Sequence, residues 1–191
     1  MTDGELAGRS IDADAATRLL LSASFVIAHN AAFDRRFIEQ RLPILKNAPW
    51  ACSRRDVDWQ ARGLDGESLG FLLMQSGWFH DAHRANGDVE AIIAILQHRS
   101  ERGLPMKDLF ERASAPSLLV DATGTHFDCK DLLKARGYRW NDSLRVWQKE
   151  IQTVGRETEQ SWLDATIYAP ERRPRAPAAD IRQITWRERY L

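Results

Sequence analysis

Two short stretches carry residues whose types and spacing suit metal-assisted hydrolysis. Asp34 follows the apolar run at 25–28, and His83 stands five residues before Asp88, just where an apolar helical pattern begins. Carboxylate oxygens suit Mg²⁺ or Mn²⁺ rather than zinc. A loop histidine with an ordinary pKa of about 6.5 can take a proton from an attacking water. Because two such ions ~3.5–4 Å apart serve phosphodiester cleavage, the combination predicts phosphodiester hydrolysis.

Simpler interpretations stay open for each residue taken alone. Asp34 could be a surface acid that complements the dipole of a helix start. Asp88 shares a helical stripe with Ile92 and Ile95, so we expect its carboxylate to point inward, where it needs a cation or strong donors. A histidine five residues before an aspartate also occurs often by chance. One of these features without the others predicts only an α/β domain.

The strands and helices that position these residues follow from the hydrophobic pattern. Residues 25–28 and 49–53 are short apolar runs of the kind found in buried strands. Phe33 and Phe37 stand one turn apart and predict an amphipathic helix that ends before Pro43. Polar residues between a strand and the next helix lie where open α/β sheets place ligands. The pattern therefore predicts a layered α/β arrangement.

Further helices are predicted along the first part of the chain. They run from Asp12 or Asp14 to Leu21, over 54–61, 67–76 and 85–98, and then to Ala113. In the helix at 85–98 an apolar stripe repeats at i, i+3, i+4 and i+7, which predicts a buried face. The residues of this stripe are Val89, Ile92, Ile93 and Leu96.

Composition bounds the classes of function. The 191 residues hold 27 Lys and Arg against 27 Asp and Glu, so a nucleic-acid ligand needs local basic patches rather than a global field. Cys52 and Cys129 lack metal-type spacing, and we expect them to be reduced and packed. No apolar run approaches the ~18 residues of a membrane span. These features predict a cytoplasmic protein without a membrane partner.

The two motifs together resemble those of a known family. AHNAAFDRRF, followed about fifty residues later by HRANGDVEAIIAIL, resembles the second and third motifs of the DEDDh 3′–5′ exonucleases, which include the DnaQ-like proofreading epsilon subunit of bacterial DNA polymerase III. The resemblance covers residues 1 to about 100. It implies a ribonuclease-H-like fold, a two-ion site for Mg²⁺ or Mn²⁺, and hydrolysis of nucleic acid from the 3′ end, with DNA favoured over RNA.

The resemblance also implies roles for residues at the matching positions. Asp34 and Asp88 become metal ligands, and His83 becomes the general base for the attacking water. Asn30 and Phe33 lie near the terminal nucleotide. His29, in the same motif, has an orienting or structural role.

This chain departs from the family at the first motif, Asp-x-Glu on a long strand. Asp3 and Glu5 have that spacing, but no strand-forming run surrounds them, so we do not expect them to be ligands. Compared with the family, this chain then lacks two of the four metal-binding carboxylates and three of the five strands. We therefore expect its activity to be impaired. The remaining strands leave an open apolar edge. The alternatives are an upstream start, a degenerate fragment, or completion by another chain, a second copy or the C-terminal strands.

A boundary is predicted near Ala115 and Pro116. We expect an N-terminally incomplete exonuclease domain over 1–114, a small α+β module over 117–168, and a Pro/Arg-rich tail over 169–191 that could dock back as a strand. Within the module, DCKDLLKARGYRWNDSLRVWQKEI interleaves basic and aromatic residues. Such residues can hold single-stranded nucleic acid, or the tryptophans can simply fill a small core.

Three functions stay open at this point. The leading one is a metal-dependent 3′–5′ exonuclease with weak activity. The second is a non-catalytic nuclease remnant that binds single-stranded nucleic acid or a protein partner. The third is a phosphodiesterase for small nucleotides on the same fold.

Overall fold

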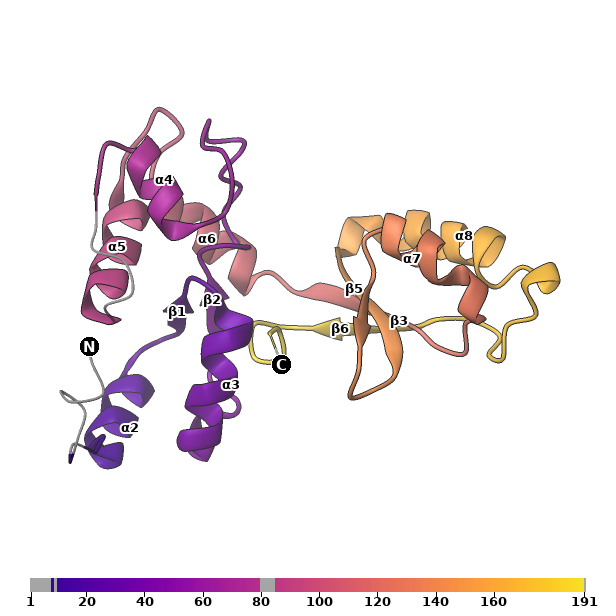
Figure 1. The fold of residues 1–191 in the computed structure, drawn as a ribbon, viewed down its shortest axis with the longest axis horizontal. Coiled ribbons are helices and arrows are strands. Elements are labelled where there is room, and N and C mark those ends of the chain that lie inside the picture. Colours follow the sequence, from indigo (N-terminus) through magenta and orange to yellow (C-terminus); the bar gives the residue numbers. More distant parts are fainter. Residues whose placement is uncertain (1–7, 9, 80–84, 191) are drawn as a thin grey trace. The chain divides into compact units, whose positions relative to one another are not determined.

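Two compact units make up the chain. The computed structural model describes residues 8, 10–79 and 85–190 (Figure 1). The first unit is Met1–Ala115 with Trp186–Leu191, and the second is Pro116–Thr185. The chain is mixed α/β, and within the described ranges no helix is long and apolar enough to cross a membrane. Residues 169–185, which were predicted to be part of the tail, belong to the second unit.

A pair of parallel strands is the centre of the first unit. β1 (Val26–Ala28) pairs with β2 (Trp50–Cys52), with Ile27 opposite Ala51. Both strands lie within the predicted runs, which confirms them. The helices of this unit are α2 (Ala13–Ser22), α3 (Ala31–Arg41), η1 (Pro43–Leu45), α4 (Leu69–Gln75), α5 (Ala85–Gln97) and α6 (Pro105–Ser114).

The two strands bury both of their faces. On one face, Trp50 and Cys52 pack with Ala31 of α3. On the other face, Ala51 and Ile27 pack against α4, α5 and α6. This alternation is the period-two pattern of a strand. The helices α3 and α5, which carry Asp34 and Asp88, therefore lie on opposite faces of the strand pair.

Two expectations about the helices are wrong. Residues 54–61 form turns instead of a helix. In α5 the fully buried residues are Ala91, Ile95 and Leu96, whereas Val89 and Ile93 are exposed. Because α5 is apolar around most of its circumference, its periodicity does not decide which side faces the core.

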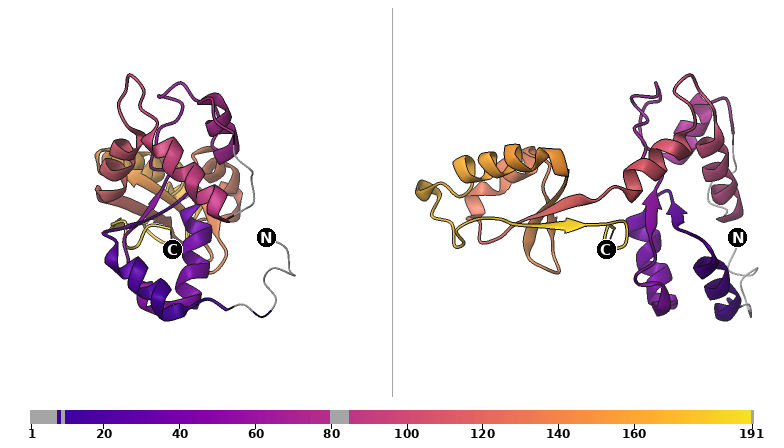
Figure 2. Two further views of the ribbon diagram at one scale, coloured as in Figure 1. Left: turned by 90° about the vertical axis from the view of Figure 1, so that its left-hand side faces the viewer. Right: turned by 180° about the vertical axis from the view of Figure 1, so that it is seen from behind.

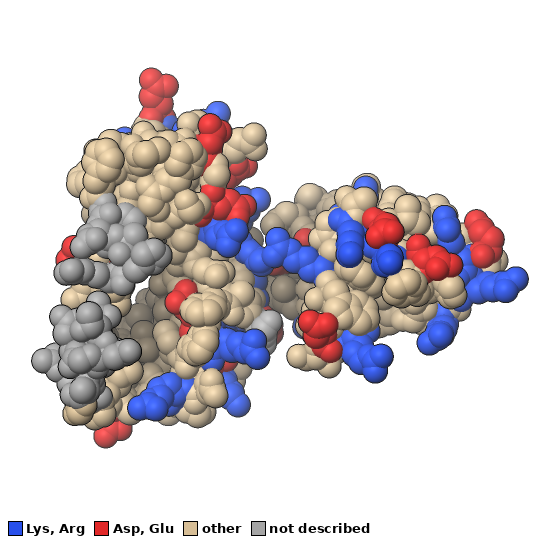
Figure 3. All heavy atoms as spheres, in the orientation of Figure 1, with Lys and Arg blue, Asp and Glu red and all other residues tan. Residues whose placement is uncertain are grey.

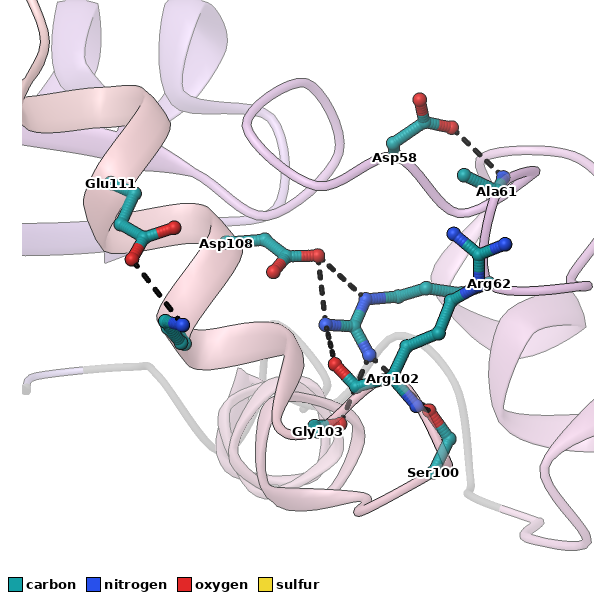
Figure 4. A network of polar contacts seen from close by, with 9 residues as sticks. Asp58, Ala61, Arg62, Ser100, Arg102, Gly103, Asp108 and Glu111 are labelled. Atoms are coloured by element: carbon teal, nitrogen blue, oxygen red, sulfur yellow. Dashed lines mark hydrogen bonds and ion pairs between the residues drawn. The ribbon is translucent and has the colours of Figure 1, made fainter.

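The buried side chain of Arg62 binds to the connection between α5 and α6 and to the start of α6 (Figure 4). The Arg62 guanidinium contacts the Asp108 carboxylate at 2.7 Å and donates to the carbonyl oxygen of Gly103 at 3.1 Å. Asp108 lies in the first turn of α6, where its charge also suits the helix dipole. This network ties the irregular segment after β2 to the start of α6.

The second unit has the order β-α-β-β-α-β. Its elements are β3 (Ser117–Ala122), α7 (Lys130–Ala135), β4 (Arg139–Asn141), β5 (Val146–Gln152), α8 (Arg156–Thr166) and β6 (Asp180–Ile184). The sheet order is β4-β5-β3-β6, with antiparallel neighbours throughout. This is the split βαβ arrangement of ferredoxin-like topologies. Both helices cover one face of the sheet, as Figure 2 shows. Leu133 of α7 and Leu163 of α8 belong to the core of this unit.

After β6 the chain returns to the first unit as a short segment, residues 186–190, which we name the C-terminal strap. The Trp50 amide donates to the Trp186 carbonyl oxygen at 3.0 Å. The Trp186 ring stacks on Phe25, with centroids 5.5 Å apart. The Tyr190 hydroxyl donates to the Asp56 carboxylate at 2.7 Å. The strap thus crosses the free edge of β2 and contacts both faces of the strand pair.

The strap does not add a strand to the first sheet. Within the described residues that sheet remains two-stranded, and no described strand pairs with the outer edge of β1. The amides of Val26 and Ser53 bond across to the partner strand, so the backbone groups of Ile27 point outward. The open edge expected from the sequence is therefore the outer edge of β1.

Candidate functional site

Asp34 lies in the first turn of α3, six residues after the end of β1. Its side chain is half-buried. Burial raises the pKa of its carboxyl above the ordinary value of 3.8, although the amides of Asn30 and Asp34 and the nearby His29 oppose the shift. Among the described residues, no Lys or Arg forms an ion pair with this carboxylate. Asp34 is therefore a partly desolvated carboxylate without a described cation beside it.

His29 is held in place by two hydrogen bonds. Its Nε2 donates to the carbonyl oxygen of Glu67 at 2.7 Å, and its Nδ1 faces the Ser53 hydroxyl at 3.0 Å. Because a carbonyl only accepts, Nε2 carries the proton, and Nδ1 accepts from Ser53. Burial lowers the pKa of this histidine. A neutral ring with both nitrogens engaged positions its neighbours and is poorly placed to act as a base.

Asn30 and Phe33 lie on the solvent side of the same turn. Asn30 caps α3 through its backbone, and its side chain makes no capping hydrogen bond. Phe33 is 58% exposed and packs against Phe37, which is 56% exposed, with ring centroids 4.7 Å apart. The two exposed aromatic rings thus belong to residues one and three positions away from Asp34 in the same helix. Such rings can stack on a nucleobase.

Asp88 lies in the first turn of α5 and is half-buried, on the side of Ala91 and Ile95. His83 lies outside the described residues, as do Asp3 and Glu5. Across the described residues, three or more potential metal-binding side chains do not gather at any one place.

One residue near Asp34 was missed in the sequence. Arg54 is the second residue after β2, and its charge helps to lower the pKa of His29. Its guanidinium pairs with Glu67 at 2.8 Å, and 45% of its side chain is exposed. The signal was available, because a basic residue just after a strand stands at the edge where α/β sheets bind ligands.

The residues present can be tested against a divalent ion. Mg²⁺ is commonly held by one or two carboxylates, with substrate phosphate and water as its other ligands. Asp34 fits that requirement as a single oxygen donor, and Asp88 does so separately. The described residues do not form a closed all-protein cage.

Comparison of the chain with protein-family models, with curated proteins and with solved structures gives no match.

Proposed function

We propose that the first unit is a metal-dependent nuclease domain that removes nucleotides from the 3′ end of DNA, with weak activity in this chain. The observation that carries the proposal is the position of Asp34. It is a half-buried carboxylate without a described ion pair, in the first turn of the helix that follows β1. Asn30, whose side chain makes no capping hydrogen bond, and the exposed Phe33 lie close by in the chain. A carboxylate at that position suits a cation, and the flanking side chains suit a nucleotide.

Each residue has a distinct part in the proposed reaction. Asp34 would supply one oxygen ligand, and Asp88, on a helix at the other face of the strand pair, is the second ligand that the motif resemblance implies. A divalent ion held by either carboxylate would neutralise charge on the phosphate. His83 takes a proton from the water that attacks phosphorus. The bond from phosphorus to the 3′ oxygen breaks, and a nucleoside 5′-monophosphate leaves. The departing 3′ oxygen takes a proton from solvent and becomes the 3′ hydroxyl of the shortened strand. Phe33 stacks on the terminal base, and Arg54 lies close enough to His29 to attract the phosphate.

Weak activity follows from the incomplete carboxylate set. A third strand paired with the outer edge of β1 would lie in the plane of the sheet. Asp34, on α3, would then be on one side of that strand, and Asp88, on α5, on the other. The family that the motifs resemble places two further carboxylates on such a strand. Without them, we propose that the ion is held loosely and that hydrolysis is slow.

A DNA single strand labelled at its 5′ end tests the reaction. In Mn²⁺, the full chain is expected to shorten this strand one nucleotide at a time, over hours and at micromolar protein. EDTA should stop the shortening, and His83→Ala should reduce it by about 10²-fold or more, since general-base catalysis contributes that much. Internal cuts would contradict the exonuclease proposal. A strong preference for dinucleotides would favour the phosphodiesterase alternative instead.

A further inference from the structure

A row of aromatic and basic side chains lies along one side of the second unit, and we name it the aromatic–basic row. Its members come from the 3₁₀ turn η2 (Phe127–Cys129), from α7 and from the hairpin of β4 and β5. The Lys130 Nζ lies 4.4 Å from the Phe127 ring centroid, and the Lys134 Nζ lies 6.0 Å from that of Trp147. Trp147 meets Trp140 edge to face, with centroids 5.5 Å apart.

The core does not account for the two ends of this row. Phe127 is 73% exposed and Trp140 is 45% exposed. By contrast, Trp147 and Trp162 pack against the core of the unit. The alternative that tryptophans only fill a small core therefore holds for those two rings and fails for Trp140. Single exposed rings are normal on a protein surface, so the evidence for a binding surface is the set of contacts that joins these rings to Lys130 and Lys134.

The positive charge of the row itself comes from Lys130 and Lys134. Arg136 and Lys149 are instead occupied by the buried Glu159 carboxylate. The remaining charged residues over 128–150 balance, four basic against four acidic. The basic ones are Lys130, Lys134, Arg139 and Arg145, and the acidic ones are Asp128, Asp131, Asp142 and Glu150. Figure 3 shows blue side chains spread over this unit with red ones between them, so the attraction is local and moderate.

The sheet face opposite the helices lacks these features. It carries a polar chain in which Asn141 donates to Gln148 at 2.7 Å and Gln148 donates to Asp121 at 2.7 Å. The strand residues on this face include no aromatic side chain. A base could not stack there, so the aromatic–basic row is the better surface.

We propose that the aromatic–basic row binds single-stranded nucleic acid. Unpaired bases stack on Trp140 and Phe127, and the phosphates between them contact Lys130 and Lys134. From Phe127 to Lys134 the helix advances roughly 10 Å, which is enough for more than one nucleotide. Paired bases cannot stack in this way, so duplexes bind more weakly. This inference stands without hydrolysis by the first unit.

Fluorescence anisotropy of a labelled dT12 with the full chain in EDTA measures this binding directly. Trp140→Ala is expected to weaken binding about tenfold, since one stacked base is worth ~1–3 kcal/mol. Trp140→Phe keeps a ring and should stay within about threefold of the wild type. Trp78→Ala removes a 52% exposed tryptophan of the first unit and should change nothing.

The salt dependence tests the basic half of the row. Replacing both Lys130 and Lys134 by alanine should make the slope of log K against log[salt] shallower by about 1.4, or ~0.7 for each phosphate contact. Lys46→Ala, at an exposed lysine of the first unit, should leave the slope unchanged. Three outcomes would overturn the proposal. They are a wild type that does not bind dT12, a Trp140→Ala variant that binds dT12 as tightly as the wild type does, and a wild type that binds an abasic 12-mer as tightly as dT12. The last outcome would indicate a general anion surface. Because EDTA removes divalent ions, no result here depends on the nuclease proposal.

Discussion

Asp34→Asn is expected to abolish 3′ hydrolysis and at the same time to make the protein more stable at pH 7. Replacing the charged carboxylate by a neutral amide weakens the hold on the ion and should lower the rate by about a hundredfold or more, because a metal ion contributes several kcal/mol of charge stabilisation. The stabilisation has a separate cause. Burial raises the pKa of Asp34, so its ionised form costs folding free energy at neutral pH. A neutral amide removes that cost.

The pH dependence of this stabilisation has a definite sign. The folded-state pKa of Asp34 lies above its unfolded value of 3.8. The cost therefore appears as the pH rises through the folded-state pKa, and it is absent below pH 3.8. Thermal midpoints of Asp34→Asn and wild type should differ at pH 7 and converge in acid.

Asp14→Asn is the matched control, because Asp14 is an exposed aspartate in the first turn of α2. It should leave hydrolysis unchanged and should not raise the thermal midpoint. If Asp34→Asn were instead less stable than wild type at pH 7, the Asp34 carboxylate would be stabilising the fold through its contacts rather than serving as a metal ligand.

The second large effect is expected at Arg35, whose side chain is buried in α3. Its Nε donates to Glu39 at 2.6 Å, and its two terminal nitrogens donate to the carbonyl oxygens of Arg187 and Arg189 at 2.6 and 2.7 Å. Arg35→Ala would leave Glu39 as a buried charge and would remove two donors from the C-terminal strap. Breaking a buried pair in this way costs about 3 kcal/mol, a large fraction of the ~5–15 kcal/mol that stabilises a domain.

Arg36→Ala is the control for this prediction, because Arg36 is the next residue of α3 and is exposed. Urea unfolding of the two variants measures the difference. Arg35→Ala should lower the free energy of unfolding, and its strap should become accessible to carboxypeptidase. Arg36→Ala should match the wild type within about 0.5 kcal/mol. Equal stability of the two variants would show that the strap does not hold the first unit together.

Local signals in the sequence were enough for most elements. Both strands of the first unit are short apolar runs with flanking breakers, and the Asp12 side chain caps α2 by accepting from the Ala15 amide at 2.9 Å. The hairpin of β4 and β5 was visible from its turn residues. Such features depend on neighbours in the chain, so a pattern can predict them.

The orientation of α3 could not be predicted, because distant residues decide it. Phe33 and Phe37 suggested an apolar buried face, and both are exposed. The buried stripe is instead Ala31, Arg35 and Glu39. An arginine is buried there because it binds carbonyl groups of a strap that lies about 150 residues further along the chain. Local rules often fail at functional or strained places, and here the failure leaves two phenylalanines facing solvent beside Asp34.

The central claim is that Asp34 is a ligand for a divalent ion, and Mn²⁺ binding tests it without reference to catalysis. Electron paramagnetic resonance of free Mn²⁺ should show binding by the full chain in the presence of thymidine 5′-monophosphate. Asp34→Asn should weaken this binding at least tenfold, whereas Asp14→Asn should bind as the wild type does. Equal Mn²⁺ affinity of wild type and Asp34→Asn, or no binding by the wild type, would contradict the claim.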